Sequence, residues 1–143
     1  MTRAVLDANV IVGAFPSAHG PLAGVLAAWR NHQFTLVSSE QILAEVERAW
    51  QSRYWRQWVS PDVVKRSLEL LRIFADVVPI TAPVSGVASH PEDDLILATA
   101  ASGAADYLVT GDRQLLALGT FYEVRIVSAR QFLDILAVSK LGG

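Results

Sequence analysis

The sequence predicts an α/β fold in which helices cover both faces of a mostly parallel sheet. Short apolar runs rich in β-forming residues alternate with longer segments of helical periodicity along all 143 residues. No internal repeat, low-complexity tract or linker divides the chain. The length suits one domain, since a domain of about 150 residues buries roughly 68–70% of its unfolded surface. We therefore expect one three-layer α/β/α domain over residues 1–143, with about five strands.

The first expected elements are a strand, a helix, a second strand and a second helix. Residues 4–6 form an apolar strand, and a loop rich in glycine and proline follows it. Pro21 suits the first turn of a helix, because the N–H group that proline lacks would be unpaired there. Residues 34–37 form the second strand, and Ser38 then caps a helix with Gln41 at the spacing of a capping box.

The middle of the chain contains two further helix starts separated by a strand and a loop. A serine, a proline and an acid at residues 60–62 begin the first of these helices. Residues 77–80 form a strand, and Pro79 favours an edge position or a strand end. A loop over residues 81–90 leads to the next helix, which begins at residues 91–94 with a proline and three acids.

The last expected elements are two strands and two helices. Residues 107–109 form a strand, and a turn at residues 110–112 leads into a short helix. Residues 124–127 form the last strand, after which Ser128 caps a final helix. Strands that alternate with helices in this way build a parallel sheet. Ligands bind such sheets just beyond the carboxyl ends of the strands, so functional residues are expected there.

Composition and charge exclude several classes of protein. Hydrophobic residues make up 52% of the chain and charged residues 18%, which is typical of a globular protein and not of a disordered one. The absence of cysteine excludes disulfides and thiolate metal sites. We expect a cytoplasmic protein without a signal peptide or membrane span, because its apolar runs are too short for either. A net charge of −2 argues mildly against a protein that grips nucleic acid by charge alone.

Acidic residues recur at the places where a parallel sheet binds ligands. Asp7 directly follows the first strand, and Asp112 lies three residues after the fourth. Asp93 and Asp94 open a helix, and Glu45 borders the apolar stripe of another. Each acid alone has an ordinary structural interpretation, such as a helix cap or a solvated side chain. Their joint pattern instead indicates a shared site.

Several carboxylates in one concave site predict a metal ion. Like charges raise each other's pKa, so the group stays fully ionised only with a cation nearby. Mg²⁺ and Mn²⁺ prefer oxygen ligands, whereas the three histidines, His19, His32 and His90, show no paired spacing that would suit zinc. Such a site suits phosphate chemistry, because the ion orients an attacking water and neutralises charge on the phosphate.

Four segments in order resemble the motifs of the PIN-domain family. These segments are Val5–Ile11, Ile42–Val46, Asp93–Ala100 and Ala105–Asp112. The match runs from residue 4 to about residue 136. Within the family, the sequence most resembles the VapC-like toxins of type II toxin–antitoxin pairs. The resemblance implies a Mg²⁺- or Mn²⁺-dependent endoribonuclease that leaves a 5′-phosphate and a 3′-hydroxyl. It also implies a homodimer and a protein antitoxin.

The resemblance also assigns site residues. The catalytic and metal-binding acids are Asp7, Glu45, Asp93 and Asp112. Two further residues match positions that order such a site by hydrogen bonds, Asn9 and Thr110. Asp93 is favoured as the third acid because an apolar pair follows one residue after it, with Asp94 as the alternative. Many members carry a further acid where this chain has Gln114, which leaves open whether one metal or two are bound.

A basic and aromatic segment is a candidate surface for RNA. Three arginines, Arg48, Arg53 and Arg56, are interleaved with Trp50, Tyr54, Trp55 and Trp58. Single-stranded RNA is bound by rings that stack on bases and by arginines that contact phosphates. An equally good interpretation is that Trp50, Tyr54 and Trp58, at helical spacing, form a buried or dimer-contact stripe.

Other protein classes fit the acids less well. A phosphatase of the haloacid-dehalogenase type needs a second aspartate where this chain has Asn9, and a two-component receiver domain needs an aspartate after the third strand, which is absent. Two alternatives stay open. One is a PIN-like fold used only as a binding scaffold, and the other is a nuclease that cuts DNA.

Overall fold

The computed structural model describes residues 1–82, 84–88 and 90–142. Pro83 and Ser89, within the loop predicted at residues 81–90, lie outside the described residues, as does Gly143 at the end of the predicted domain. In the described part of the chain, no helix is long and apolar enough to cross a bilayer.

A six-stranded sheet forms the centre of the fold. Its strands are β1 (Arg3–Leu6), β2 (Thr35–Ser38), β3 (Asp76–Val77), β4 (Tyr107–Val109), β5 (Thr120–Phe121) and β6 (Val124–Val127). They are arranged in the order β3-β2-β1-β4-β6-β5, and every neighbouring pair is parallel except β5 with β6. The chain first builds the sheet outward from β1 to β3 and then returns to the other side of β1. The point where the order reverses therefore lies between β1 and β4.

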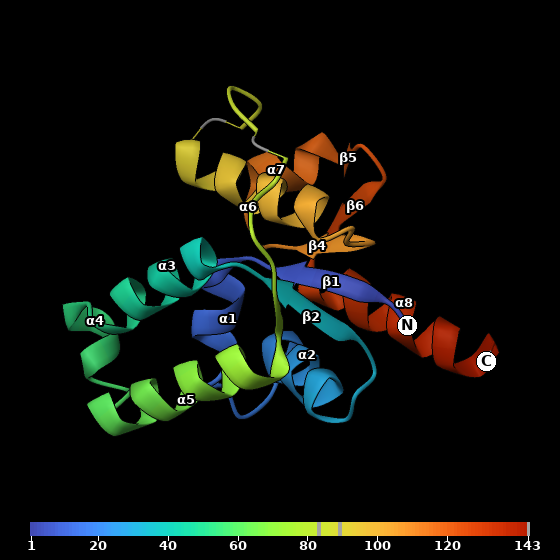
Figure 1. Ribbon diagram of the computed structural model, residues 1–143. Coiled ribbons are helices and arrows are strands. Elements are labelled where there is room, and N and C mark those ends of the chain that lie inside the picture. Colours follow the sequence, from blue (N-terminus) through green and yellow to red (C-terminus); the bar gives the residue numbers. More distant parts are fainter. Residues whose placement is uncertain (83, 89, 143) are drawn as a thin grey trace.

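Helices cover the two faces of the sheet. They are α1 (Ala8–Ala14), α2 (Pro21–Arg30), α3 (Glu40–Trp50), α4 (Arg53–Arg56), α5 (Pro61–Phe74), α6 (Pro91–Ser102), α7 (Arg113–Leu118) and α8 (Ala129–Gly142). In Figure 1, α6 lies on one side of β1, and α2 lies with α8 on the other. The three-layer α/β fold with a mostly parallel sheet is thus confirmed.

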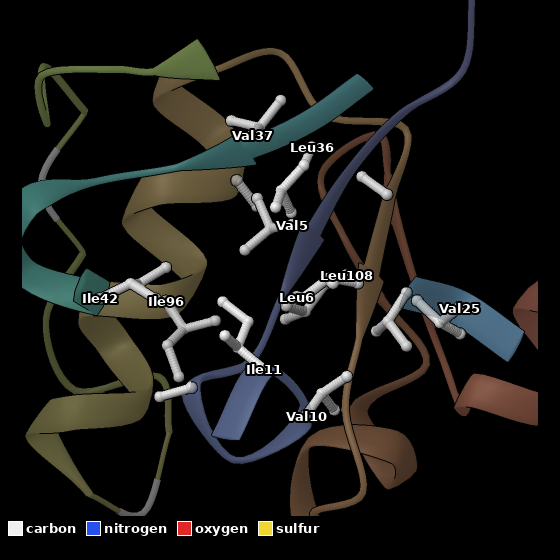
Figure 2. Packing of buried hydrophobic residues seen from close by; sticks show 14 of the residues in the cluster. Val5, Leu6, Val10, Ile11, Val25, Leu36, Val37, Ile42, Ile96 and Leu108 are labelled. Atoms are coloured by element: carbon white, nitrogen blue, oxygen red, sulfur yellow. The ribbon is translucent and has the colours of Figure 1, made fainter. Parts of the chain in front are cut away.

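The core follows from the apolar strands at the centre of the sheet. Strand β1 is buried on both faces from Ala4 to Leu6, as parallel strands covered by helices must be, and these three residues are correspondingly apolar. Figure 2 shows Ile96 of α6 on one side of this strand and Val25 of α2 on the other. Gly103 lets the end of α6 approach β2, because a Cβ there would lie 2.5 Å from Cγ1 of Val37.

Helix α1 occupies the position where the sequence predicts a loop. Asp7 caps this helix, and most of the seven residues from Ala8 to Ala14 are buried. Gly13 suggests a loop, but it lies in the helix where α2 approaches closely. A Cβ at Gly13 would be 2.9 Å from Cδ1 of Leu22. This glycine therefore lies within a helix, beside a close tertiary contact, and not in a turn.

Strand β2 ends one residue later than predicted, which moves the helix cap. Ser38 is the last residue of β2, and its carbonyl oxygen accepts a hydrogen bond from the Val78 N–H at 2.9 Å. Ser39 caps α3 instead, because its Oγ accepts from the N–H of Ile42. The predicted capping box between Ser38 and Gln41 is therefore wrong.

Two other boundaries also differ. The third strand covers Asp76–Val77, not residues 77–80, because Pro79 cannot donate to the ladder. Strand β5, which is only two residues long, is the one strand that the sequence analysis does not predict. It pairs antiparallel with β6 through a turn at Tyr122, whose φ is 53°.

Candidate functional site

Asp7 and Thr110 lie side by side at the point where the strand order reverses. They follow β1 and β4, two parallel neighbours in which Leu6 is paired with Val109. The Thr110 hydroxyl donates to Oδ2 of Asp7 at 2.7 Å and accepts from the N–H of Asp112 at 3.0 Å. One threonine thus connects the acid after β1 with the acid that begins α7.

An open cavity of about 300 Å³ lies next to Asp7. Its lining consists of Asp7, Ala8, Asn9, Glu45, Arg48, Ala49, Glu92, Asp93 and Ile96. These residues come from the start of α1, the middle of α3 and the start of α6, which meet beyond the carboxyl end of β1 in Figure 1. Three of the four predicted acids therefore face one cavity, while Asp112 is not part of its wall.

The position of Glu45 follows from how α3 is anchored. Ile42 and Val46 are buried, and Figure 2 shows Ile42 beside Ile96 of α6. Ser39 at the start of α3 shares a 2.9 Å hydrogen bond with the hydroxyl of Thr99 in α6. Glu45, at the margin of this buried face, is directed to the cavity between the two helices.

Asp93 and Asp94 differ in what they contact. Asp93 lines the cavity and is partly exposed. Asp94 is only 6% exposed, and its carboxylate accepts hydrogen bonds from three consecutive backbone N–H groups. The donors are Gly86 at 3.0 Å, Val87 at 3.2 Å and Ala88 at 2.7 Å. Asp94 thus holds the loop before α6, which leaves Asp93 as the acid that faces the cavity.

The loop contact gives a stability prediction for Asp94→Ala. The free energy of unfolding should fall by about 2 kcal/mol, because hydrogen bonds to a charged acceptor contribute more than neutral ones. Hydrogen exchange at the amides of residues 86–88 should accelerate more than exchange in the sheet. Asp93→Ala is the matched control and should leave both quantities unchanged or improve stability. Equal effects of the two variants would refute the assignment of Asp94 to the loop and of Asp93 to the cavity.

Asp112 caps α7 and acts on the site through its charge. Its Oδ1 accepts from the N–H groups of Gln114 at 2.8 Å and Leu115 at 3.2 Å. The hydrogen bonds of Asp112 are therefore those of an ordinary helix cap. Its negative charge nevertheless contributes to raising the pKa of both Asp7 and Asp93.

Glu92 is a cavity residue that sequence reasoning missed. It lies next to Asp93 in the first turn of α6 and lines the same cavity. The sequence signal is weak, because an acid in a first helical turn usually serves the helix dipole. The first turn of α6 contains three acids, Glu92, Asp93 and Asp94, which is more than a favourable interaction with the helix dipole needs. This surplus is the feature that could have indicated a role for Glu92 in the cavity.

Three carboxyl groups of the cavity, those of Asp7, Glu45 and Asp93, have raised pKa values. Burial raises the pKa of Asp7, although the hydrogen bond from Thr110 lowers it in part. Burial also raises the pKa of Glu45, and the charges of Glu92 and Asp7 add to this effect. For Asp93, burial again comes first, followed by the charges of Asp112 and Asp7. Burial is thus the main cause of all three raised pKa values, and neighbouring negative charges add to it.

This electrostatic pattern suits a bound cation. Among the described residues, no three His, Asp or Glu side chains already form a set that could hold a metal ion. The donors that line the cavity are carboxylate oxygens, which Mg²⁺ and Mn²⁺ prefer. A cation would also offset the burial and the charge repulsion that raise these pKa values. Asp7, Glu45 and Asp93 line the cavity and could serve as ligands once their side chains draw closer together.

The three candidate RNA-contact arginines lie in different surroundings. Arg48 lines the acidic cavity, and its charge lowers the pKa of Glu45. Arg56 instead lines a separate groove of about 750 Å³ between α3, α4 and α5. Arg53 is exposed on α4. Only Arg48 is therefore placed to reach a molecule bound at the acids.

The aromatic residues of this segment do not form one stripe. Helix α3 ends at Trp50, so Trp50, Tyr54 and Trp58 do not share a helix. Trp50 is 1% exposed and belongs to the core, whereas Tyr54 is 61% and Trp58 is 66% exposed. The interpretation as a single buried stripe is therefore wrong, and two rings are open to solvent.

Comparisons with known proteins agree with this architecture. A family model described as "PIN domain" matches residues 3–114. A search of curated proteins found no significant match. Among solved structures, the chain is similar to a chain in the crystal structure of VapBC2 from Rickettsia felis bound to a DNA fragment from their promoter. That likeness has a TM-score of 0.59 at 17% identity and covers 87% of this chain and 97% of the other. At this level of identity, the similarity shows a shared fold.

Proposed function

Because this chain belongs to the PIN-domain family, we propose that it is an endoribonuclease that depends on Mg²⁺ or Mn²⁺. One observation carries the proposal. An acid-lined cavity lies beyond β1, next to the point where the strand order reverses, and burial, together with nearby negative charges, raises the pKa of Asp7, Glu45 and Asp93 in its wall. A site of that kind favours a divalent cation and, through it, a phosphate group.

The residues of the chain have distinct parts in the proposed reaction. Asp7, Glu45 and Asp93 would hold the ion. When bound, a divalent ion supplies charge neutralisation at the phosphate and a water that ionises more readily. Thr110 fixes the orientation of the Asp7 carboxylate by donating to Oδ2. Asp112 adds negative charge near Asp7 and Asp93 and thereby strengthens their attraction for the cation.

Two further polar residues line the cavity and carry no negative charge. Asn9 follows Asp7 in α1, and its backbone N–H donates to Oδ1 of Asp7 at 3.4 Å. Arg48 offers a positive charge at the rim, where a phosphate next to the cut would lie. We propose that Asn9 supports the acids and that Arg48 contacts the RNA backbone.

We further propose that the protein is the toxin of a toxin–antitoxin pair. The support is the likeness in fold to a chain of the VapBC2 complex. The proposal includes a cytoplasmic homodimer whose activity a protein antitoxin blocks. Expression of the chain alone should then arrest growth, whereas expression of Asp93→Asn should not. Growth that is equally normal with both would remove the support for a toxin.

The function is tested by cleavage of labelled single-stranded and hairpin RNAs with Mg²⁺, with Mn²⁺ and with EDTA. We expect cleavage in either metal, none in EDTA, and a loss of roughly 10²-fold or more in Asp93→Asn, because metal catalysis contributes several kcal/mol. Cleavage that persists in Asp93→Asn would move the third ligand elsewhere.

The same assay decides between RNA and the two alternatives. Matched DNA strands added as competitors should leave RNA cleavage unchanged if RNA is the substrate. Cleavage of DNA in preference to RNA would identify a DNA nuclease. If no nucleic acid is cut, calorimetric titration with Mn²⁺ shows whether the cavity binds an ion, and an absence of binding would favour a scaffold.

Arg48→Gln is expected to weaken RNA binding by removing one phosphate contact. The slope of log affinity against log salt should become shallower by about one unit. Arg53→Gln is the control, because Arg53 is exposed on α4 and does not line the cavity. Binding assays with the inactive Asp93→Asn background avoid cleavage during titration. An unchanged slope in Arg48→Gln would contradict the phosphate contact.

A further inference from the structure

A second, smaller crevice adjoins the acidic cavity. It has a volume of about 60 Å³ and lies between the loop before α6 and the helix α7. Its lining consists of Val87, Ala88, Asp93, Gln114, Leu115 and Leu118. Asp93 also lines the acidic cavity, so one carboxylate separates the two spaces. A molecule held at the acids can therefore extend into the crevice without leaving the protein surface.

The walls of the crevice suit the edge of a flat ring. Val87 on the loop and Leu118 on α7 are 44% and 41% exposed, and Leu115 is buried beneath them. Because one water molecule takes about 30 Å³ of liquid volume, the crevice holds part of a ring and not a whole nucleotide. Apolar side chains that leave solvent when a ring enters would stabilise such a contact.

Gln114 supplies the neutral polar side chain of this crevice, beside the carboxylate of Asp93. Its amide carries both hydrogen-bond donors and an acceptor, as the edge of a nucleobase does. Across residues 1–82, 84–88 and 90–142, the Gln114 side chain makes no hydrogen bond with the protein. Its backbone is fixed by the 2.8 Å bond from its N–H to Asp112. The exposed amide therefore extends from a fixed backbone position beside the crevice and is available to a ligand.

The opposite wall is held by Asp94. The three N–H groups that this carboxylate accepts belong to Gly86, Val87 and Ala88, and two of these residues line the crevice. A wall fixed in this way can discriminate between ligands, because a mobile wall would adapt to all of them.

From these contacts we infer that the crevice is a nucleobase subsite beside the scissile phosphate and that Gln114 is its specificity-determining residue. The inference rests on the proposed nuclease function and adds a reason for sequence preference. A base adjacent to the cut enters between Val87 and Leu118, and its edge exchanges hydrogen bonds with the Gln114 amide.

The test uses short RNAs that differ in one base on either side of the cut, with kcat/KM measured for each. Wild type should prefer one base at one of these positions by roughly ten- to hundredfold, the discrimination that a pair of hydrogen bonds provides. Gln114→Ala should still cut in a metal-dependent manner but should lose most of that preference. Gln41→Ala is a matched control, since both glutamines are exposed second residues of a helix.

The outcomes separate this inference from the proposed function. If wild type cuts RNA but Gln114→Ala keeps the same order of preference, the subsite is refuted and the nuclease stands. Wild-type cleavage without any preference at either position also refutes it. If wild type shows no metal-dependent cleavage, the proposed function and the subsite both fail.

Discussion

Replacing Asp7 by Asn is expected to reduce RNA cleavage by roughly 10³-fold, because metal catalysis provides several kcal/mol and each 1.36 kcal/mol is a factor of ten. Asp7 is buried at the end of β1, and its carboxylate receives the Thr110 hydroxyl. Asparagine keeps the shape and an acceptor for that hydroxyl but loses the charge that would hold the ion. The fold should therefore persist while catalysis is lost.

The same variant should be more stable than wild type when metal is absent. The pKa of Asp7 in the folded protein is raised, chiefly by burial, so folding disfavours its ionised form. The penalty is absent below the ordinary pKa of an aspartate, grows as the pH rises towards the raised value, and is complete above it. In EDTA at neutral pH, Asp7→Asn should consequently melt at a higher temperature than wild type. The difference should shrink as the pH is lowered.

Metal should reverse this order of stability. A ligand at a hundred times its Kd stabilises the folded state by about 2.7 kcal/mol, so wild type should gain stability in Mn²⁺ while Asp7→Asn gains little. Asp134→Asn, on the exposed surface of α8, is the control and should follow wild type in every assay. Full activity in Asp7→Asn, or an equal response of the two proteins to Mn²⁺, would show that Asp7 is not a ligand.

The position of the candidate site at the edge of the sheet could be expected from the sequence, because it depends on topology. An apolar strand followed by an acid, in a chain that predicts a parallel sheet, indicates that Asp7 lies at a ligand-binding edge. The pairing of β4 with β1, which brings Thr110 to Asp7, comes from the structure, because alternating elements do not fix the strand order. The different contacts of Asp93 and Asp94 could not be predicted in the same way. They depend on the path of the loop over residues 86–88. Two adjacent aspartates look alike in the sequence, so the sequence does not show which of them contacts that loop.

The elements that sequence reasoning missed are those in which a tertiary contact overrides a local signal. Gly13 favours a loop locally, yet it allows Leu22 to approach helix α1. Two residues are too few for β5 to show strand periodicity, and its pairing depends on the backbone conformation of Tyr122. For Trp50, spacing suggested a stripe with Tyr54, whereas the structure buries it against α1.

Trp50 connects the two helices that carry Asp7 and Glu45. Its indole Nε1–H donates to the carbonyl oxygen of Val12 in α1 at 3.2 Å. In a regular helix this carbonyl would accept from residue 16, but Pro16 has no N–H. The ring also contacts Phe15 edge-on, with centroids 5.6 Å apart. Trp50 therefore completes the end of α1 while it anchors the end of α3.

Trp50→Ala is expected to lower the free energy of unfolding by about 3–5 kcal/mol, as truncation of a buried aromatic does. That is a large part of the roughly 5–15 kcal/mol that a domain possesses. Urea unfolding measures it as a lower midpoint with an unchanged slope. Because α1 and α3 would lose a shared contact, stabilisation by Mn²⁺ should also weaken, although no ligand is removed.

Two substitutions separate packing from the hydrogen bond and from exposure. Trp50→Phe keeps a ring in the core but leaves the Val12 carbonyl without its donor, so a loss of about 1–2 kcal/mol is expected. Trp58→Ala removes an equally large side chain from an exposed position and should change stability by less than about 0.5 kcal/mol. If Trp58→Ala proved as damaging as Trp50→Ala, the exposed ring would be part of a folded interface. The contact of Trp50 with α1 would then no longer explain why Trp50 matters more for stability than Trp58.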